Sequence, residues 1–388
     1  MTTQDLIIFG VIMLGRLIAP LFIPRFPLPG VLVSMVLDAV DQTIFQTYTT
    51  VGTPDWYQGY DKAFDIYYLT IAFLATYRNW ENIVAFSMSR FLYFFRLIGV
   101  VLFESTGARA LLLLFPNTFE YFFITIEAVR TRWNVKKMAP VLVVLIAFAI
   151  WVFIKVPQEY WIHIAKLDFT DAVRSAYSND PTLLFVLIVV ILLLAVAAKR
   201  ILSQSLPPAD WSFRIQVREA DLDVTPEEVA AARARAASRF LDEDLITKVS
   251  MVILVAVIFS HVLPGMDIGP FQLMAGIGSV VIISTAVSEW LVRKGHSAPD
   301  TAVQFLVMFV INAIAIAGLA FLLPGDFLDL DFGSLGNYIF MVGLISLLVS
   351  LYDRFQPYYA ARLVKYHAER ERHKEIEAKV DAMMAAGD

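Results

Sequence analysis

Residues 29–46, PGVLVSMVLDAVDQTIFQ, and residues 61–77, DKAFDIYYLTIAFLATY, decide the fold of this chain. Both stretches are mostly apolar and reach the roughly 17–25 residues that a helix needs to cross a bilayer. Each also contains two aspartates, and a carboxylate at membrane depth costs roughly 2.5–3.5 kcal/mol on insertion scales. The sequence therefore predicts two membrane-spanning helices whose acidic side chains are compensated by a cation, either divalent metal ions or translocated ions and protons.

The composition extends this interpretation to the whole chain. Hydrophobic residues make up 58% and charged residues only 17% of the 388 residues, far from the composition of soluble domains. The first residues lack the positive region and the cleavage site of a secretory signal, so we expect the first span to be retained. There is no cysteine, which excludes disulfides, thiolate nucleophiles and cysteine metal sites.

Apolar stretches of spanning length recur from end to end, so the predicted fold class is an all-α, polytopic helical membrane protein. We predict about eleven transmembrane helices and a small cytoplasmic insert. The predicted spans are 5–23, 29–46, 61–77, 82–103, 107–129, 139–156, 182–201, 245–264, 271–292, 302–323 and 333–353.

The distribution of basic residues indicates on which side of the membrane each loop lies. They follow the fifth span at 130–137, the seventh at 199–200 and the ninth at 293–294, and they are frequent in the C-terminal tail. The turns 265–270 and 325–336 contain no lysine or arginine. The positive-inside rule then places the C-terminus in the cytoplasm, the N-terminus outside and the aspartates in the outer half of the membrane.

Two segments outside the membrane have patterns of their own. Residues 211–218 alternate apolar and polar side chains, as a half-buried strand does. Thr225, Pro226 and Glu228 then supply a cap, a first-turn proline and a capping-box glutamate, which predicts a helix over about 226–242. A second charged helix is expected over 358–386. The charged face of each helix is either simply solvated or binds a protein partner.

We therefore divide the chain into a transmembrane domain with the four-aspartate site, an external interfacial segment with the seventh span, a cytoplasmic insert, a four-helix transmembrane domain and a cytoplasmic charged helix. The boundaries are 1–156, 157–201, 202–244, 245–353 and 354–388.

The spacing of the aspartates predicts a shared site. Asp38 and Asp41 are three residues apart and Asp61 and Asp65 four apart, so each pair lies on one helical face. The segment 47–60 turns the chain back, which lets the two pairs meet at the same depth. Carboxylate oxygens without histidine or cysteine favour Mg²⁺, Mn²⁺ or Ca²⁺ over zinc. With two metal ions, such a site can hold the attacking and leaving oxygens of a phosphoryl transfer.

This spacing resembles the D-x2-D-G-x2-A-R … G-x3-D-x3-D signature of the CDP-alcohol phosphotransferases, over at most residues 5–156. The resemblance implies that all four aspartates bind divalent metal, which we expect to be Mg²⁺ or Mn²⁺ by the chemistry above, and that Asp65 also acts as the base. It also implies charged partners at Arg16, Arg90 and Arg96. Gln42 stands at the glycine of the signature, and residues 45–46 are not its Ala-Arg pair.

Further polar residues could complete the site. Arg90, Arg96 and Glu120 lie within predicted spans and should point inward, where the arginines either pair with acidic residues or bind an anionic substrate group. His163 and Lys166 follow the sixth span on the predicted side of the aspartates. We predict His163 as a catalytic acid alongside Asp65, and Lys166 as a substrate contact, although a histidine at an interface is often structural.

Three functions remain open from the sequence. The first is a metal-dependent enzyme that transfers or hydrolyses a phosphoryl group on a membrane lipid or lipid-linked substrate. The second is a cation- or proton-coupled transporter or channel, and the third is a non-catalytic membrane scaffold derived from an enzyme.

Basic residues are not patterned for nucleic acid. Short loops and the lack of cysteine and of eukaryotic targeting signals favour a bacterial inner membrane.

Overall fold

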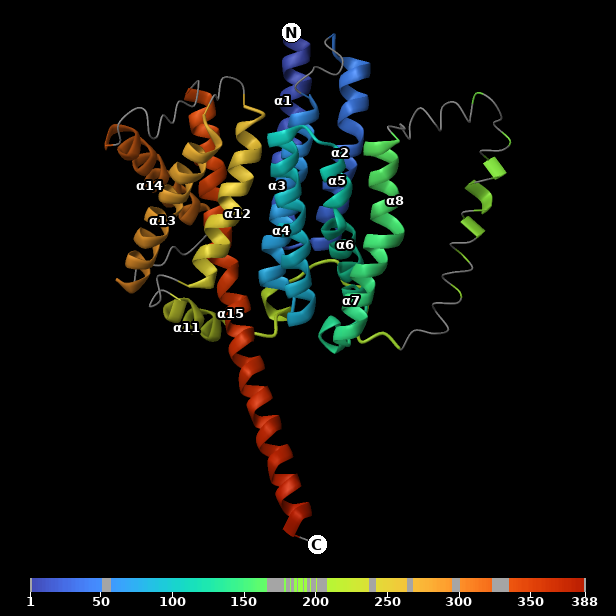
Figure 1. Cartoon of the computed structure of the whole chain (residues 1–388), viewed down its shortest axis with the longest axis vertical. Coiled ribbons are helices and arrows are strands. Elements are labelled where there is room, and N and C mark those ends of the chain that lie inside the picture. The colour runs from blue at the N-terminus through green and yellow to red at the C-terminus, as the bar shows by residue number, and fades with distance from the viewer. Residues whose placement is uncertain are drawn as a thin grey trace.

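The computed structural model describes residues 2–50, 57–165, 208–236, 242–263, 268–294, 301–322 and 335–386, together with single helical positions between 178 and 200. Within these ranges the regular elements are all helices and no β-strand occurs, which confirms the all-α class (Figure 1). The N-terminus lies at one end of the helical bundle, and the C-terminus extends beyond the other end.

The N-terminal half contains α1 to α8. Their bounds are Thr3–Ile18 for α1, Pro27–Tyr48 for α2, Tyr57–Asn79 for α3, Ile83–Thr106 for α4, Ala110–Leu114 for α5, Thr118–Arg130 for α6, Pro140–Ala149 for α7 and Val156–Glu159 for α8. A wider, π-helical segment at 150–155 joins α7 to α8, so these two form one continuous rod.

The C-terminal half contains α11 to α15. Their bounds are Pro226–Ala236 for α11, Glu243–Ser260 for α12, Pro270–Arg293 for α13, Thr301–Leu322 for α14 and Leu335–Ala386 for α15.

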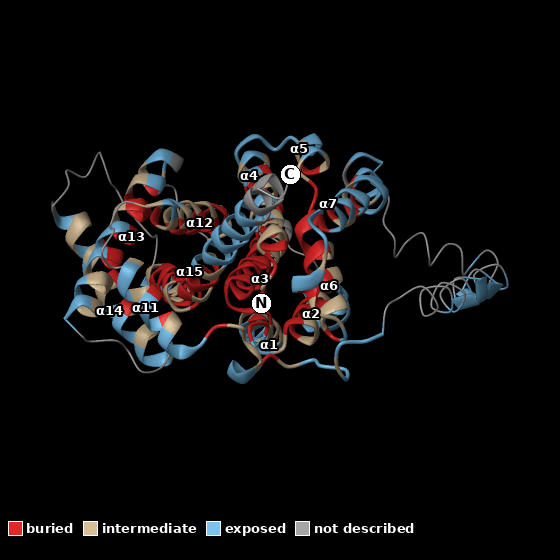
Figure 2. Ribbon diagram, turned by 90° about the horizontal axis from the view of Figure 1, so that it is seen from below, coloured by how far each residue is buried: buried red, intermediate tan, exposed pale blue. Residues whose placement is uncertain are grey.

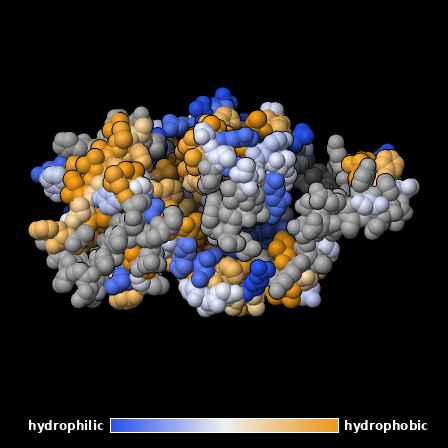
Figure 3. Space-filling model, turned by 90° about the horizontal axis from the view of Figure 1, so that it is seen from above, coloured by the Kyte–Doolittle hydropathy of each residue, from blue (hydrophilic) through white to orange (hydrophobic). Residues whose placement is uncertain are grey.

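Eight helical segments of the described chain are long and apolar enough to cross a membrane, so the protein is a multi-pass membrane protein. They match eight of the predicted spans, including 107–129, where α5 and α6 are separated at Pro116. Their exposed surfaces are rich in apolar side chains, for example on α1 and α7. Seen from the N-terminal end, hydrophobic regions flank a more hydrophilic middle (Figure 3). The predicted span 182–201 lies largely outside the described residues.

The predicted spans 61–77 and 245–264 also form helices, but α3 and α12 are not among the eight apolar segments. For α12 the reason is its charge, since Glu243, Asp244 and Lys248 lie within its 18 residues. For α3 the reason is its position. Helix α3 is the central helix of the bundle and is buried along almost its whole length (Figure 2). Because other helices separate α3 from lipid, it tolerates tyrosines and aspartates that a lipid-facing helix would not.

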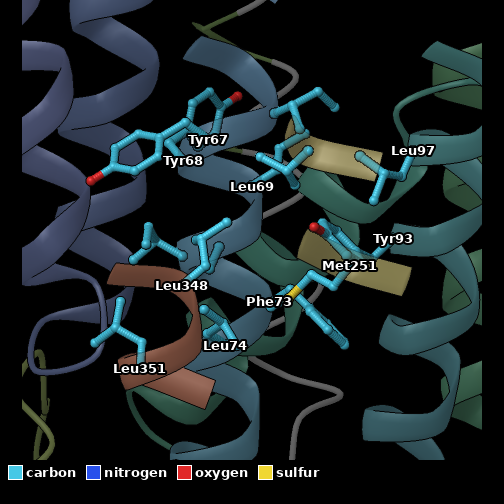
Figure 4. Close-up of a cluster of buried hydrophobic side chains, with 14 of the residues drawn as sticks. Tyr67, Tyr68, Leu69, Phe73, Leu74, Tyr93, Leu97, Met251, Leu348 and Leu351 are labelled. Carbon is cyan, nitrogen blue, oxygen red and sulfur yellow. The ribbon is translucent and has the colours of Figure 1, made fainter. Parts of the chain in front are cut away.

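A single hydrophobic core joins the two halves of the chain. In its centre, side chains from α3 and α4 pack with side chains from α12 and α15 (Figure 4). Aromatic pairs are frequent there. The rings of Phe73 and Tyr93 stack at 4.3 Å between centroids, and those of Phe86 and Tyr359 stack at 3.9 Å. Aromatic packing therefore connects α15 directly to the N-terminal helices.

Helix α15 is longer than the sequence indicates. We predicted a span at 333–353 and a separate charged helix at 358–386, but the structure joins them in one helix of 52 residues that contains Pro357. A proline inside a helix removes one backbone hydrogen bond, here the bond to the carbonyl of Asp353. The helix continues because its residues on both sides of Pro357 are buried in the core.

The strand predicted at 211–218 is wrong. The helix predicted over about 226–242 is present as Pro226–Ala236, and residues 237–241 lie outside the described residues. Residues 213–218 have no regular structure, and the segment binds loops instead of a sheet: Arg214 N donates to Thr131 O at 2.9 Å and Val217 N donates to Arg25 O at 2.9 Å. The alternation of its side chains reflects this docking, in which Val217 is buried while Phe213 is exposed. Helix α11 begins at Pro226.

The capping box predicted for α11 is present, because Glu228 N donates to Thr225 Oγ1 at 3.3 Å and Thr225 N donates to Glu228 Oε2 at 2.8 Å. The insert is then held on the bundle by Arg362 of α15. Its guanidinium is buried and donates to Tyr77 O at 2.8 Å, to Arg78 O at 2.6 Å and to Asp223 Oδ1 at 2.7 Å. One side chain thus caps the end of α3 and binds the insert.

Candidate functional site

The four aspartates meet, as their spacing predicts, and they meet around the guanidinium of Arg16. Helix α2 supplies Asp38 and Asp41, α3 supplies Asp61 and Asp65, and α1 supplies the arginine. Nη1 of Arg16 donates to Asp41 and Nη2 donates to Asp38. Oδ1 of Asp61 lies 3.2 Å from Nη1, and Oδ1 of Asp65 lies 3.2 Å from Nη2.

Arg16 is held from other directions as well. Its side chain is only 3% exposed, and its guanidinium lies 5.4 Å from the ring centroids of both Tyr60 and Phe64 on α3. The faces of aromatic rings attract a cation, most strongly where water is excluded. Four aspartates from two helices therefore position the arginine by charge, and the rings of Tyr60 and Phe64 contact it as well.

The role of Arg16 at the centre was not predicted. The resemblance pointed to a charged residue at this position. Neither charge spacing nor hydropathy, however, predicts that a residue of the first span contacts residues of the second and third spans. The available signal was a lone arginine in an otherwise apolar span, which almost always faces a partner inside the bundle.

Three of the four carboxylates also lie close enough together to hold a metal ion. One oxygen each of Asp38, Asp61 and Asp65 lies within 4.8 Å of the others. Oxygens on opposite sides of an octahedral Mg²⁺ are about 4 Å apart and those around Ca²⁺ about 5 Å, since the metal–oxygen distances are about 2.1 and 2.4 Å. The donor set and its spacing therefore fit a hard divalent cation.

Asp41 differs from the other three aspartates. It is fully buried against Arg16, whereas the side chains of Asp38, Asp61 and Asp65 are 28%, 34% and 25% exposed. The three-carboxylate cluster, defined here as Asp38, Asp61 and Asp65, is thus reachable from outside the bundle. Asp41 chiefly holds the arginine.

The charges of the site do not balance internally. Four carboxylates and one guanidinium have a net formal charge of −3, from four negative charges and one positive charge. Lys62 lies within electrostatic range of Asp61 and Asp65 and offsets part of this excess. A net negative site with exposed oxygens attracts cations.

The site lies toward the N-terminal end of the bundle. Asp61 and Asp65 follow the first residue of α3, Tyr57, by about 6 and 12 Å along the axis at 1.5 Å per residue. That end is opposite the end from which the C-terminal helix extends (Figure 1).

A second polar network lies beside the aspartates, around Glu120 of α6. Tyr68 OH donates to Glu120 Oε1 at 2.7 Å, and Asn117 Nδ2 donates to Oε2 at 2.7 Å. Lys155 Nζ lies 3.5 Å from the same carboxylate and 4.0 Å from the ring centroid of Tyr121. Glu120 therefore faces the bundle interior, as expected, and its main cationic contact is a lysine that the sequence did not single out.

The predicted substrate-binding arginines have separate surroundings. Arg96 Nη1 donates to Phe115 O at 3.0 Å and lies 3.9 Å from Glu159, and its Nε is buried without a hydrogen bond to any described residue. Arg90 instead binds Glu243 of α12 at 2.8 Å. The structure thus places Arg96 beside the Glu120 network and Arg90 at the contact between α4 and α12.

Of the remaining predicted residues, only His163 lies within the described part of the chain, near the end of the α7–α8 rod. His163 belongs to the helical segment 160–164, but the placement of its side chain is not described, and Lys166 lies outside the described residues. The neighbouring Tyr160 and Trp161 are exposed, as residues of an aromatic belt at the membrane surface are.

Comparison with family models, with curated proteins and with solved structures gives no match to this chain. The interpretation of the site therefore depends on its own geometry and charge.

Proposed function

We propose that this membrane protein binds a divalent cation, Mg²⁺ or Mn²⁺, at Asp38, Asp61 and Asp65, and that it transfers or hydrolyses a phosphoryl group of a membrane lipid or lipid-linked substrate. The observation that carries the proposal is the convergence of carboxylate oxygens from three partly exposed aspartates within 4.8 Å. The excess of negative charge at the site supports it, because the arginine neutralises only one of four carboxylates.

The residues of the chain then have distinct roles. A bound divalent cation would polarise the phosphoryl oxygens. Arg16 can donate to the phosphate group of the substrate if the phosphate replaces one of the carboxylates that the guanidinium now binds. The planar guanidinium suits a phosphate. Asp65 accepts the proton of the acceptor hydroxyl or water, whose oxygen bonds to phosphorus as the bond to the leaving oxygen breaks. Exposed apolar side chains of α1 and α2 face the lipid from which a substrate would enter.

The test is the metal content of the purified protein. We expect stoichiometric Mn²⁺ after equilibration, measured by elemental analysis, and loss of most of it in Asp61→Asn and Asp65→Asn. Glu375→Gln, on the exposed end of α15, is the matched control and should keep its metal. Lipid profiling of a deletion strain would identify the substrate class. A folded wild-type protein that binds no divalent metal at millimolar concentrations would overturn the proposal.

A second candidate function is cation or proton transport, and one observation favours it. The guanidinium of Arg16 is a cation that binds the aspartates, and it belongs to the protein. An ion that enters the site would replace the guanidinium at the carboxylates. Ion flux into reconstituted vesicles, abolished by Asp61→Asn, would support transport. Vesicles that stay tight under imposed proton, Na⁺ and Mg²⁺ gradients would exclude it.

We further propose a bacterial inner membrane with the C-terminus in the cytoplasm and the N-terminus outside. Arg25, Arg78, Arg130 and Lys137 all lie at the end of the bundle from which α15 extends, as the positive-inside rule requires of a cytoplasmic face. Because the chain has no cysteine, a single introduced cysteine reports sidedness. We expect Glu375→Cys to react with an impermeant maleimide only after the inner membrane is opened.

Membrane lipid is the partner that the exposed apolar helices support. For a protein partner, the exposed stretch 366–379 of α15 is the better candidate of the two predicted segments, because the insert is already bound to the chain's own loops.

A further inference from the structure

The C-terminal half contains a cavity of about 540 Å³, independent of the aspartate site. It lies among α12, α13, α14 and α15, at the end of these helices near α11 (Figure 2). Sites that bind small organic molecules have volumes of roughly 300–1,000 Å³ and combine an apolar lining with a few polar groups. The cavity falls within this range and has both kinds of wall.

One wall is apolar and comes mainly from α13 and α14. It contains Leu291, Val292, Val303, Val307 and Met308. The polar wall, defined by the polar lining residues, comes mainly from α12, α13 and α15. An occupant that combines an apolar body with a polar group fits this lining.

The positive charge in the polar wall is already matched. Lys248 of α12 is buried, and its Nζ lies 2.5 Å from Asp353 Oδ1 of α15 and 3.2 Å from Thr285 Oγ1 of α13. Ser288 Oγ donates to the other oxygen of Asp353 at 3.3 Å. The lysine is consequently held by the protein itself and is poorly placed to attract an anion.

Acidic side chains, in contrast, outnumber basic ones in the lining. Oε2 of Glu289 is buried and accepts no hydrogen bond from a described residue, although Arg293 lies 3.5 Å away. Pro357 has no N–H for the backbone carbonyl of Asp353, and both residues line the cavity. The lining also contains Asp242 and Asp244, so four acidic side chains face two basic ones, Lys248 and Arg233.

We propose that this cavity binds an amphipathic amine, that is, a protonated primary ammonium group attached to an apolar body. The ammonium donates to Glu289 Oε2 and to neighbouring acceptors of the polar wall, and the apolar body packs against α13 and α14. The net formal charge of the lining, −2 from four acidic and two basic side chains, selects a cation over an anion or a neutral molecule.

Two probes of equal shape test this inference on the full-length protein in detergent. We expect 1-aminoadamantane, protonated at pH 7, to bind at least tenfold more tightly than 1-adamantanol by isothermal titration calorimetry. Equal affinity of the two compounds, or binding of neither, would overturn the proposal.

Variants then locate the site. Glu289→Gln should weaken amine binding at least tenfold, while Glu375→Gln on the exposed end of α15 should leave it unchanged. Ser288→Phe, which fills the cavity, should abolish binding of both probes. If Glu289→Gln does not fold, the comparison of the probes on the wild type and on Ser288→Phe still decides. Unchanged amine binding in Ser288→Phe would overturn the assignment to this cavity.

The ammonium group could belong to a free amine or to a lipid head group. Nanodiscs separate these sources. Weaker binding of 1-aminoadamantane in phosphatidylethanolamine than in phosphatidylcholine supports the lipid amine as the occupant, and equal binding supports a free amine. Metal binding by Asp38, Asp61 and Asp65 should be the same in the cavity variants, so the two proposals fail separately.

Discussion

The two halves of this protein bury charge in opposite ways. In the N-terminal half one arginine binds four aspartates, and in the C-terminal half one lysine binds one aspartate beside a cavity. The Lys248–Asp353 pair is balanced in charge and closed by hydrogen bonds, so it can serve as structure alone. The aspartate site remains acidic after its arginine is counted. This excess of charge is the reason that we propose a further ligand for the aspartate site.

The largest effect is expected from Arg16→Met. Removing one partner of a buried ion pair costs about 3–5 kcal/mol, and here four carboxylates lose their shared partner, so we expect a loss near the upper end, about 5 kcal/mol. The free energy of unfolding in detergent measures it, with Arg370→Met on the exposed tail as the control. Added Mg²⁺ should restore part of the loss. Unchanged stability of Arg16→Met would remove the difference between the two halves.

The next effect concerns the Lys248–Asp353 pair. Lys248→Met should lower the free energy of unfolding by about 3 kcal/mol, because one carboxylate is left unpaired. The double variant Lys248→Met, Asp353→Leu should return to within about 1 kcal/mol of the wild type, since apolar residues can replace a balanced buried pair.

The matched double variant in the other half is Arg16→Met, Asp41→Asn. It should stay unstable, because three carboxylates remain together. If both double variants recover equally, charge excess is not what separates the two regions.

A smaller effect should divide the aspartates themselves. Asp41→Asn removes a fully buried charge-assisted hydrogen bond and should cost about 2 kcal/mol of stability, whereas Asp38→Asn, partly exposed, should cost about 1 kcal/mol. Metal affinity should respond in the reverse order, with at least a tenfold loss in Asp38→Asn and less in Asp41→Asn. Parallel losses in both variants would show that all four aspartates form one site.

The smallest effect is expected for a charged contact outside the membrane-spanning helices, at Asp210 of the insert. Asn134 N donates to Asp210 at 2.8 Å and Lys137 pairs with it, and these contacts hold the pKa of Asp210 below its usual value of 3.8. Because the folded pKa is lowered, the stabilisation is present at neutral pH and is lost as the pH falls below about 3.8.

Hydrogen exchange of the backbone at 210–214 measures this effect. Protection should be higher at pH 5 than at pH 3 in the wild type. In Asp210→Asn it should be reduced at pH 5 and should depend less on pH. Stability of the membrane helices should change little in this variant. Equal protection at pH 5 in the wild type and the variant would show that Asp210 does not hold the insert.

Much of the fold follows from local patterns. Hydrophobic length predicted the spanning helices, and Thr225 with Glu228 predicted the start of α11, because these signals reside in neighbouring residues. The meeting of the two aspartate pairs also follows from helical spacing across one short turn. These features need no information about the rest of the bundle.

Other features depend on contacts between distant segments. Arg16 lies 22–49 residues from its aspartate partners, and Lys248 lies 105 residues from Asp353. No sequence periodicity connects such distant positions. The alternation at 211–218 indicated a strand because every second side chain can pack against a neighbouring surface. Here that surface is formed by loops and not by a sheet. The continuity of α15 through Pro357 likewise depends on tertiary packing, which proline propensity does not include.

The continuous α15 has a mechanical consequence. At 1.5 Å per residue its 52 residues make a rod of about 78 Å, and Tyr352, Asp353 and Gln356, which line the cavity, lie on the same rod as the exposed stretch 366–379. Rigid rods transmit torsion and axial displacement with little attenuation. A tilt of the helix caused by filling the cavity would therefore displace its C-terminal end, which extends beyond the bundle, further than the residues that line the cavity.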